Sequence, residues 1–194
     1  MADSDGIKTR VTDGQGDGIV AATNDPDGSI LQGLDGDDHL RGGRYDDIIR
    51  GGEGDDTMRG GDGADVFQFF GFDSSGRDEI GGTSDTDKIY DLDFSEGDQL
   101  SFANYGYTFT DASGLNAFGA ADADGNTAHI SSWEGLAAFI TQANASNPGS
   151  VTYSEKGTTD VLILDITNVV NGDHQILHIT GGYSALDAAL HPAP

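Results

Sequence analysis

The most regular feature of the chain is an apolar residue that recurs at every ninth position between residues 33 and 68. Four consecutive blocks carry it, and they read GLDGDDHLR, GGRYDDIIR, GGEGDDTMR and GGDGADVFQ. The eighth position of these blocks is Leu40, Ile49, Met58 and Phe67. A nine-residue period is too short for a helical hairpin and suits one short strand plus one tight turn. Two blocks then make one coil of about 18 residues, so blocks one and three stack along one edge and blocks two and four along the other.

Strand and helix patterns follow the repeat. Alternating apolar residues predict strands over Gln99–Tyr105, Val151–Ser154, Asp160–Thr167 and Gln175–Thr180. The dipeptide Asn171-Gly172 predicts a hairpin turn between the last two. Ser131 and Glu134 have the spacing of a capping box and predict a helix near 132–144, and a second short helix is expected over 181–190.

Charge and composition narrow the possible partners. The chain has 34 acidic and 9 basic side chains, a net charge of −25, 30 glycines and no cysteine. Nucleic acids and anionic lipids would be repelled, so cations are the expected partners. Disulfides and thiolate metal sites are excluded. No stretch is long and apolar enough for a transmembrane segment, and we expect no cleavable leader at the start of the chain.

The acidic residues also follow the nine-residue period. The sixth position of every block is aspartate, as Asp38, Asp47, Asp56 and Asp65. Stacking places Asp38 near Asp56 and Asp47 near Asp65, and two such carboxylates about 4 Å apart repel by roughly 4 kcal/mol at an effective dielectric constant near 20. Ca²⁺, a hard cation that accepts six to eight oxygen ligands, would reverse this repulsion better than Mg²⁺. A solvated acidic linker is the alternative, and the regular apolar residues argue against it.

These blocks resemble the RTX, or hemolysin-type, calcium-binding family, whose repeat is G-G-x-G-x-D-x-U-x. The resemblance implies a parallel β-roll with Ca²⁺ between successive turns, held by position-6 carboxylates and by the main-chain carbonyls of positions 2 and 4. Besides the four aspartates, the implied ligands are the carbonyls of Leu34, Gly36, Gly43, Tyr45, Gly52, Gly54, Gly61 and Gly63. Leu34 and Tyr45 depart from the repeat, because glycine is expected at both. A fainter block at 24–32 offers Asp25 and Asp27 as further carboxylates.

The expected fold is therefore mostly β, a parallel β-roll followed by a β-rich C-terminal cap with one or two short helices. We expect degenerate turns of the roll in 1–32, the roll itself in 33–70 and the cap in 71–194. A segment within the cap, 87–100, resembles the element that closes RTX rolls, and its carboxylates either bind further Ca²⁺ or lie in turns. A solenoid end exposes its core, so such a cap has a structural purpose.

The expected function is calcium binding without catalysis. The five histidines form no H-E-x-x-H motif, and His174 and His178 fall on a predicted strand, about 13 Å apart, too far for one zinc ion. We expect at least two calcium ions and up to about five, and folding on calcium binding outside the cell, as part of a secreted or cell-surface bacterial protein. The type I secretion machinery is then a partner. The alternative is a calcium-scaffolded module that binds a polysaccharide or a cell surface, as an accessory domain of an epimerase, a protease or an adhesin.

Overall fold

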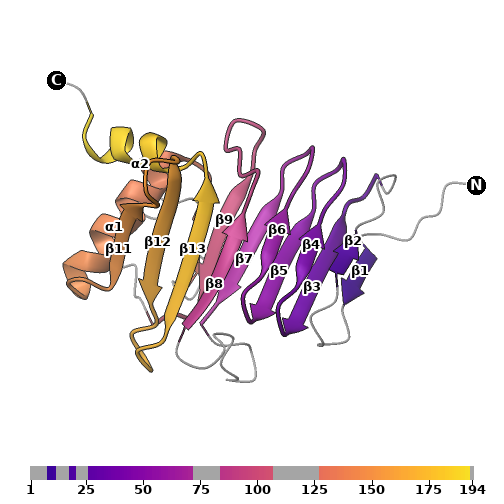
Figure 1. Cartoon of the computed structure of the whole chain (residues 1–194), viewed down its shortest axis with the longest axis horizontal. Coiled ribbons are helices and arrows are strands. Elements are labelled where there is room, and N and C mark those ends of the chain that lie inside the picture. Colours follow the sequence, from indigo (N-terminus) through magenta and orange to yellow (C-terminus); the bar gives the residue numbers. More distant parts are fainter. Residues whose placement is uncertain (1–7, 12–17, 21–25, 72–83, 107–126, 193–194) are drawn as a thin grey trace, which may run out of the picture.

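The fold consists of two β-sheets that face each other, with two helices at the C-terminal end (Figure 1). The computed structural model describes residues 8–11, 18–20, 26–71, 84–106 and 127–192. The strands of the first sheet, in spatial order, are β1 (Lys8–Val11), β3 (Ser29–Asp35), β5 (Ile48–Glu53), β7 (Val66–Phe70), β9 (Gln99–Ala103) and β10 (Thr127–Ile130). Those of the second are β11 (Val151–Glu155), β12 (Val161–Thr167), β13 (His174–Thr180), β8 (Ser84–Ile89), β6 (Thr57–Arg59), β4 (His39–Arg41) and β2 (Gly18–Val20). The prediction of a mostly β chain with a roll and one or two short helices is confirmed, and the described residues contain two.

The chain alternates between the two sheets from β1 to β9, and each strand pairs in parallel with the strand two before it. Ile49 of β5 lies beside Leu31 of β3, and Met58 of β6 lies beside Leu40 of β4, a register of 18 residues in both sheets. This is the coil that the nine-residue period predicts. Each coil places one apolar side chain per sheet in the interior, because a three-residue strand has only one inward position.

The interior of the roll is a ladder of these position-8 side chains. Leu31, Leu40, Ile49, Met58 and Phe67 are at most 2% exposed. The ladder continues past the repeat with Ile89 and Leu100, which pair with Met58 and Phe67 and are fully buried. The parallel pairing therefore extends beyond residue 70, through β8 and β9.

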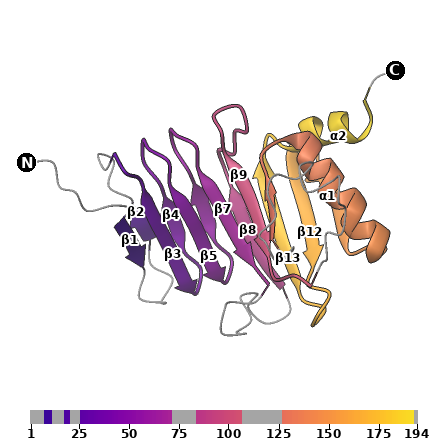
Figure 2. The same ribbon diagram turned by 180° about the vertical axis from the view of Figure 1, so that it is seen from behind.

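Antiparallel strands and helices close the C-terminal end. β10 pairs antiparallel with β9, and β11 and β12 follow β13, which itself pairs in parallel with β8. The predicted hairpin turn at Asn171-Gly172 joins β12 to β13. Helices α1 (Trp133–Ser146) and α2 (Tyr183–Leu190) lie at this end of the molecule (Figure 2).

The cap has a continuous apolar core. Leu162, Leu164 and Ile166 of β12 are fully buried in one cluster with Leu136 and Phe139 of α1. The ring of Phe139 stacks 5.3 Å from that of Phe102 in β9, and Phe102 stacks 5.5 Å from Phe69 in β7. The cap thus seals the roll with aromatic side chains.

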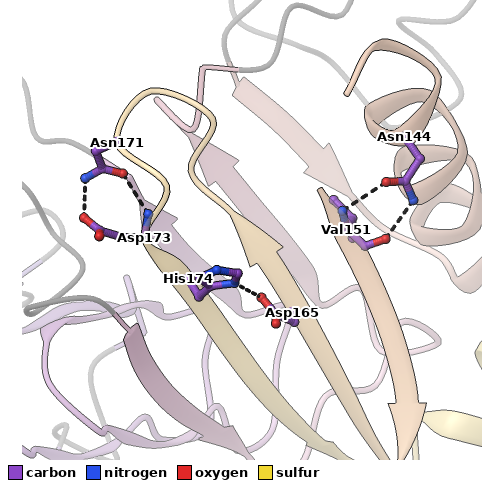
Figure 3. A network of polar contacts seen from close by, with 6 residues as sticks. All are labelled: Asn144, Val151, Asp165, Asn171, Asp173 and His174. Atoms are coloured by element: carbon purple, nitrogen blue, oxygen red, sulfur yellow. Dashed lines mark hydrogen bonds and ion pairs between the residues drawn. The ribbon is translucent and has the colours of Figure 1, made fainter. Parts of the chain in front are cut away.

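Polar contacts fix the connections of the cap (Figure 3). The side-chain amide of Asn144 in α1 donates to the carbonyl of Val151 at 2.7 Å and accepts from its N–H at 3.1 Å, which ties the helix to β11. His174 and Asp165 form a 2.7 Å hydrogen bond across β13 and β12. Asn171 accepts from the backbone N–H of Asp173 and stabilises the hairpin turn.

Helix α1 begins one residue later than the predicted capping box implies. Its N-cap is Ser132, whose hydroxyl accepts from the N–H of Gly135 at 3.0 Å, whereas the box required Ser131 as cap and Glu134 as partner. The start places Trp133 in the first turn, where its ring packs edge-on against Phe94 at 4.9 Å. In the described part of the chain, neither helix has the length and apolar character needed to cross a membrane.

Candidate metal centre

The four position-6 aspartates lie at the two edges where the chain passes between the sheets. Each ends a glycine-rich turn and immediately precedes a strand, and each is at most 3% exposed: Asp38, Asp47, Asp56 and Asp65. The 18-residue register brings Asp38 beside Asp56 and Asp47 beside Asp65. The stacking expected from the spacing is therefore present.

In three of the four aspartates, Asp47, Asp56 and Asp65, one carboxylate oxygen accepts a backbone N–H from the turn before it. Asp56 Oδ1 accepts from the backbone N–H of Asp38, and Asp65 Oδ1 accepts from that of Asp47, both at 2.8 Å. Asp47 Oδ1 likewise accepts from Ser29 N–H at 2.6 Å. These bonds align the turns. At Asp47 the other oxygen is engaged as well, since Oδ2 accepts from the backbone N–H of Gly43 at 2.7 Å.

The second oxygen of Asp56 and of Asp65 is buried and has no hydrogen-bond partner among the described residues. Each oxygen is directed at the position-1 glycine of its own block, where a Cβ on Gly51 or Gly60 would collide with it. Glycine at this position therefore leaves room for the carboxylate. A buried anionic oxygen without a partner is costly, and a cation is the group that offsets this cost.

The electrostatics of the metal-free turns support the same conclusion. Burial, first, and then the neighbouring Asp38, Asp85 and Asp37 carboxylates raise the pKa of Asp56 to about 8. Burial also raises the pKa of Asp65 to about 7, with Asp98, Asp47 and Asp91 adding to the effect. Backbone hydrogen bonds act in the opposite direction at both positions but do not outweigh the loss of solvent.

Main-chain carbonyls from neighbouring turns meet at the same edges. A Cβ on Gly52 would collide with the carbonyl oxygen of Leu34, and one on Gly61 would collide with that of Gly43. At position 4, a Cβ on Gly54 would lie 2.7 Å from the carbonyl oxygen of Gly36, and one on Gly63 would lie 3.0 Å from that of Tyr45. All eight residues expected to supply carbonyls thus lie in stacked turns. Their assignment as calcium ligands stays a prediction.

The two departures from the repeat behave differently. Leu34 has φ = +80°, a left-handed conformation in which a branched side chain is strained. Tyr45 is not among the described residues with positive φ, and neither is Gly43. The turn of block two therefore has another backbone conformation from the turns of the other three blocks. The carbonyl of Gly43 in this turn accepts a hydrogen bond from the N–H of Asp62 at 3.1 Å.

The stacked carboxylates continue beyond the repeat. Asp87 Oδ1 accepts from Asp56 N–H at 2.8 Å, and Asp98 Oδ1 accepts from Asp65 N–H at 2.9 Å. Both are buried, and burial raises the pKa of both. Segment 87–100 therefore supplies the next position-6 carboxylate at each edge. The shared signal is an aspartate two residues before the buried apolar residue, as in Asp87/Ile89 and Asp98/Leu100.

A second ladder of aspartates lies on the outside of the turns, and the sequence reasoning missed it. Asp37 accepts from the N–H of Asp55, Asp46 from that of Ala64, and Asp55 from that of Thr86, at 2.9–3.0 Å. These position-5 carboxylates reach forward to the next turn, whereas the position-6 carboxylates reach back. The repeated Asp-Asp pair of the first three blocks is the signal that could have revealed this role.

Polar contacts link the last turn of the roll to the cap. Gln175 of β13 donates to Asp87 Oδ2 at 3.0 Å and accepts from the Tyr105 hydroxyl at 3.3 Å. All three side chains are buried. The position of Asp87, and through it the turn that ends at Asp56, therefore depends on the cap.

The fainter block contributes less to this arrangement. Asp27 is exposed, and Asp25 lies outside the described residues. Within the described ranges, no group of three or more His, Cys, Asp or Glu side chains is placed to hold a metal on its own. A site built from the described residues would therefore have to add main-chain carbonyls to the carboxylates. Buried carboxylates together with carbonyl oxygens are the hard donors that suit Ca²⁺.

Comparison with protein families agrees with this geometry. Residues 32–67 match the RTX calcium-binding nonapeptide repeat in four copies. No curated protein matches the chain. The match covers the stacked turns and strands β4 to β6 and ends before β8, β9 and the cap.

Proposed function

We propose that the RTX repeats bind Ca²⁺ between their stacked turns and that this binding drives the roll to fold. The observation that carries the proposal is the pair of buried Asp56 and Asp65 oxygens, which have no hydrogen-bond partner among the described residues and lie within rows of further carboxylates. Asp38, Asp47, Asp56, Asp65 and the position-2 and position-4 carbonyls would hold the ions. Bound Ca²⁺ supplies the positive charge that these oxygens lack.

Without the cation, the roll has little else to stabilise it. Each turn buries one apolar side chain while it orders nine residues, and several of these are glycines with a high conformational entropy in the unfolded chain. The stacked carboxylates then either repel or take up protons. Metal binding and folding are therefore coupled, as in other sites whose ligands assemble only in the folded state.

This coupling suits a protein that is exported unfolded and folds outside the cell. Extracellular calcium modules operate with dissociation constants of about 10⁻⁴–10⁻³ M, far above free cytosolic calcium. A chain of net charge −25 would stay extended where calcium is scarce. We accordingly place the protein in the extracellular space, as a type I secretion substrate whose described part acts by binding and folding rather than by catalysis.

Circular dichroism with and without calcium tests the proposal. The part of the β signal that comes from the roll should appear on addition of Ca²⁺ in the millimolar range, be lost in excess EGTA, and return only weakly with Mg²⁺ at the same concentration. A β spectrum that is unchanged in EGTA, with no residual metal by elemental analysis, would exclude calcium-driven folding.

A further inference from the structure

Basic side chains collect on one outer face of the seven-stranded sheet. The chain has only 9 Lys and Arg against 34 Asp and Glu, yet the outward positions of β4, β6 and β8, together with Tyr90 directly after β8, contain no acidic residue. These positions, which we call the basic face, are His39, Arg41, Thr57, Arg59, Ser84, Thr86, Lys88 and Tyr90. Three of the nine basic residues of the chain thus share a small neutral-to-positive surface.

Strand register arranges these side chains in rows that cross the strands. Arg41 lies beside Arg59, and His39, Thr57 and Lys88 lie beside one another. His178 on β13 extends the second row next to Lys88. Neighbouring strands are about 4.8 Å apart, so the rows run along the long axis of the roll, over β4, β6, β8 and β13 (Figure 1).

Arg41 and Arg59 are exposed on this face, and Lys88 is half-buried. The Arg59 guanidinium lies 4.5 Å above the ring of Tyr90, which is 40% exposed. Lys156 Nζ lies 3.4 Å from His178 Nδ1. Burial and then the positive charges of Lys156 and Lys88 lower the pKa of His178, against a smaller opposing effect of Asp55. Several positive charges therefore lie close together on one face of a strongly acidic protein.

The surroundings of the face limit the shape of an anionic partner. The exposed position-5 aspartates, Asp37 and Asp55, border it at the adjoining turns. Duplex DNA is wide and has one charge per about 1.7 Å of its axis, so it would also contact these carboxylates and be repelled. A single thin chain with spaced charges can follow the rows between the turns.

We propose that the basic face binds an extended polysaccharide that carries carboxylate groups. Arg41 and Arg59 donate to sugar carboxylates, for which the planar guanidinium is well matched. Lys88 contributes charge, and the Tyr90 ring offers an apolar surface beside the arginines. This inference rests on the proposed calcium-dependent folding, because the basic face is formed only in the folded roll.

Binding of the calcium-loaded full chain to polygalacturonate tests the proposal. Isothermal titration at fixed free calcium should show saturable binding that weakens with added salt. The double variant R41Q/R59Q should weaken binding by at least about tenfold, since charge-assisted hydrogen bonds are lost. The matched control is R44Q/R50Q, which removes the same charge from a turn and from the six-stranded sheet and should bind as the parent does. Circular dichroism with and without calcium verifies that every variant folds.

Each other outcome would overturn the proposal. Equal weakening by both double variants would mean that only net charge matters. Parent-like binding by R41Q/R59Q would mean that calcium bridges the polymer to the acidic turns. Equal binding of the methyl-esterified polymer would exclude the carboxylates as the recognised group, and equally tight binding of DNA would exclude a preference for glycans. Failure of calcium-dependent folding would appear in the dichroism of the parent, separately from any of these results.

Discussion

The roll and the cap are built on the same two sheets but are stabilised by different interactions. In the cap, Leu162, Leu164 and Ile166 pack against α1 in a fully buried apolar core. In the roll, buried aspartates such as Asp56 and Asp65 lie in the turns, beside the single apolar side chain of each short strand. Apolar burial can therefore account for the cap, whereas the roll needs a counter-ion. The same backbone arrangement can be held by two chemistries within one chain.

The largest effect is expected from a cavity in the core of the cap. Leu164→Ala should lower the free energy of unfolding by about 2–5 kcal/mol, because it removes a fully buried side chain. The calcium affinity of the roll should be nearly unchanged. Ile163→Ala, one residue away on the outward side of β12, is the control and should cost about 1 kcal/mol or less. Chemical denaturation measures the free energy of unfolding, and calcium titration measures the affinity. A large loss of calcium affinity in Leu164→Ala would contradict the view that cap and roll are stabilised by different interactions.

The effect of one substitution in the roll on the free energy of unfolding should depend on whether calcium is bound. Asp56→Asn keeps an oxygen to accept the Asp38 N–H but removes the charge. With saturating calcium it should destabilise by about 1–3 kcal/mol, and in EGTA it should be neutral or stabilising because a buried charge is gone. The control is Asp62→Asn, at an exposed position of the same roll, which should leave the free energy of unfolding nearly unchanged both with calcium and in EGTA. Destabilisation of equal size in both conditions would show that Asp56 serves hydrogen bonding alone.

The raised pKa values of Asp56, about 8, and Asp65, about 7, give the metal-free roll a pH dependence. Carboxylates titrate near 4 in an unfolded chain, so between about pH 4 and 8 the folded metal-free state binds more protons than the unfolded state. Its stability is fully present below about pH 4 and is lost as the pH rises through these values. Calcium displaces the protons, so calcium affinity should rise across the same window, by up to about tenfold per pH unit for each proton released. Titration calorimetry in buffers of different ionisation enthalpy counts those protons, and zero released protons at pH 6 would contradict the assignment.

The smallest effect concerns the two departures from the repeat. Leu34→Gly should stabilise the calcium-loaded roll by about 1 kcal/mol, because it relieves a left-handed leucine. Tyr45→Gly should instead destabilise the roll by about 0.5–1 kcal/mol. Tyr45 is not among the described residues with positive φ, so glycine relieves no strain there and only adds conformational entropy to the unfolded chain. Thermal unfolding with calcium compares the pair. Stabilisation by both substitutions would mean that the turn of block two also needs glycine.

The sequence predicted the roll well because its period is fixed. The position-8 residues, the 18-residue register and the pairs Asp38/Asp56 and Asp47/Asp65 all follow from a repeat of nine. Where the interval changes, the sequence left the role of the carboxylates in 87–100 open: Asp87 follows Asp56 by 31 residues and Asp98 follows Asp65 by 33. The local pattern of aspartate two residues before an apolar residue persists there, but its spacing does not.

The basic face could not be predicted from the sequence either. Arg41 and Arg59 are 18 residues apart and follow the repeat, but Lys88 and His178 join them only through the pairing of β6 with β8 and of β8 with β13. The parallel pairing of β13 with β8 joins segments about ninety residues apart, and no local pattern encodes it. The helix boundary, by contrast, was missed by a single residue, because Ser131 and Ser132 are both good caps.

Hydrogen exchange measured by mass spectrometry, with calcium and with EGTA, tests the central claim most directly. If calcium stabilises the roll and apolar burial stabilises the cap, amides of β4 to β7 should lose nearly all protection in EGTA, while those of β12 and β13 should retain much of theirs. Full protection of the repeat turns in EGTA, with no metal bound, would contradict the account.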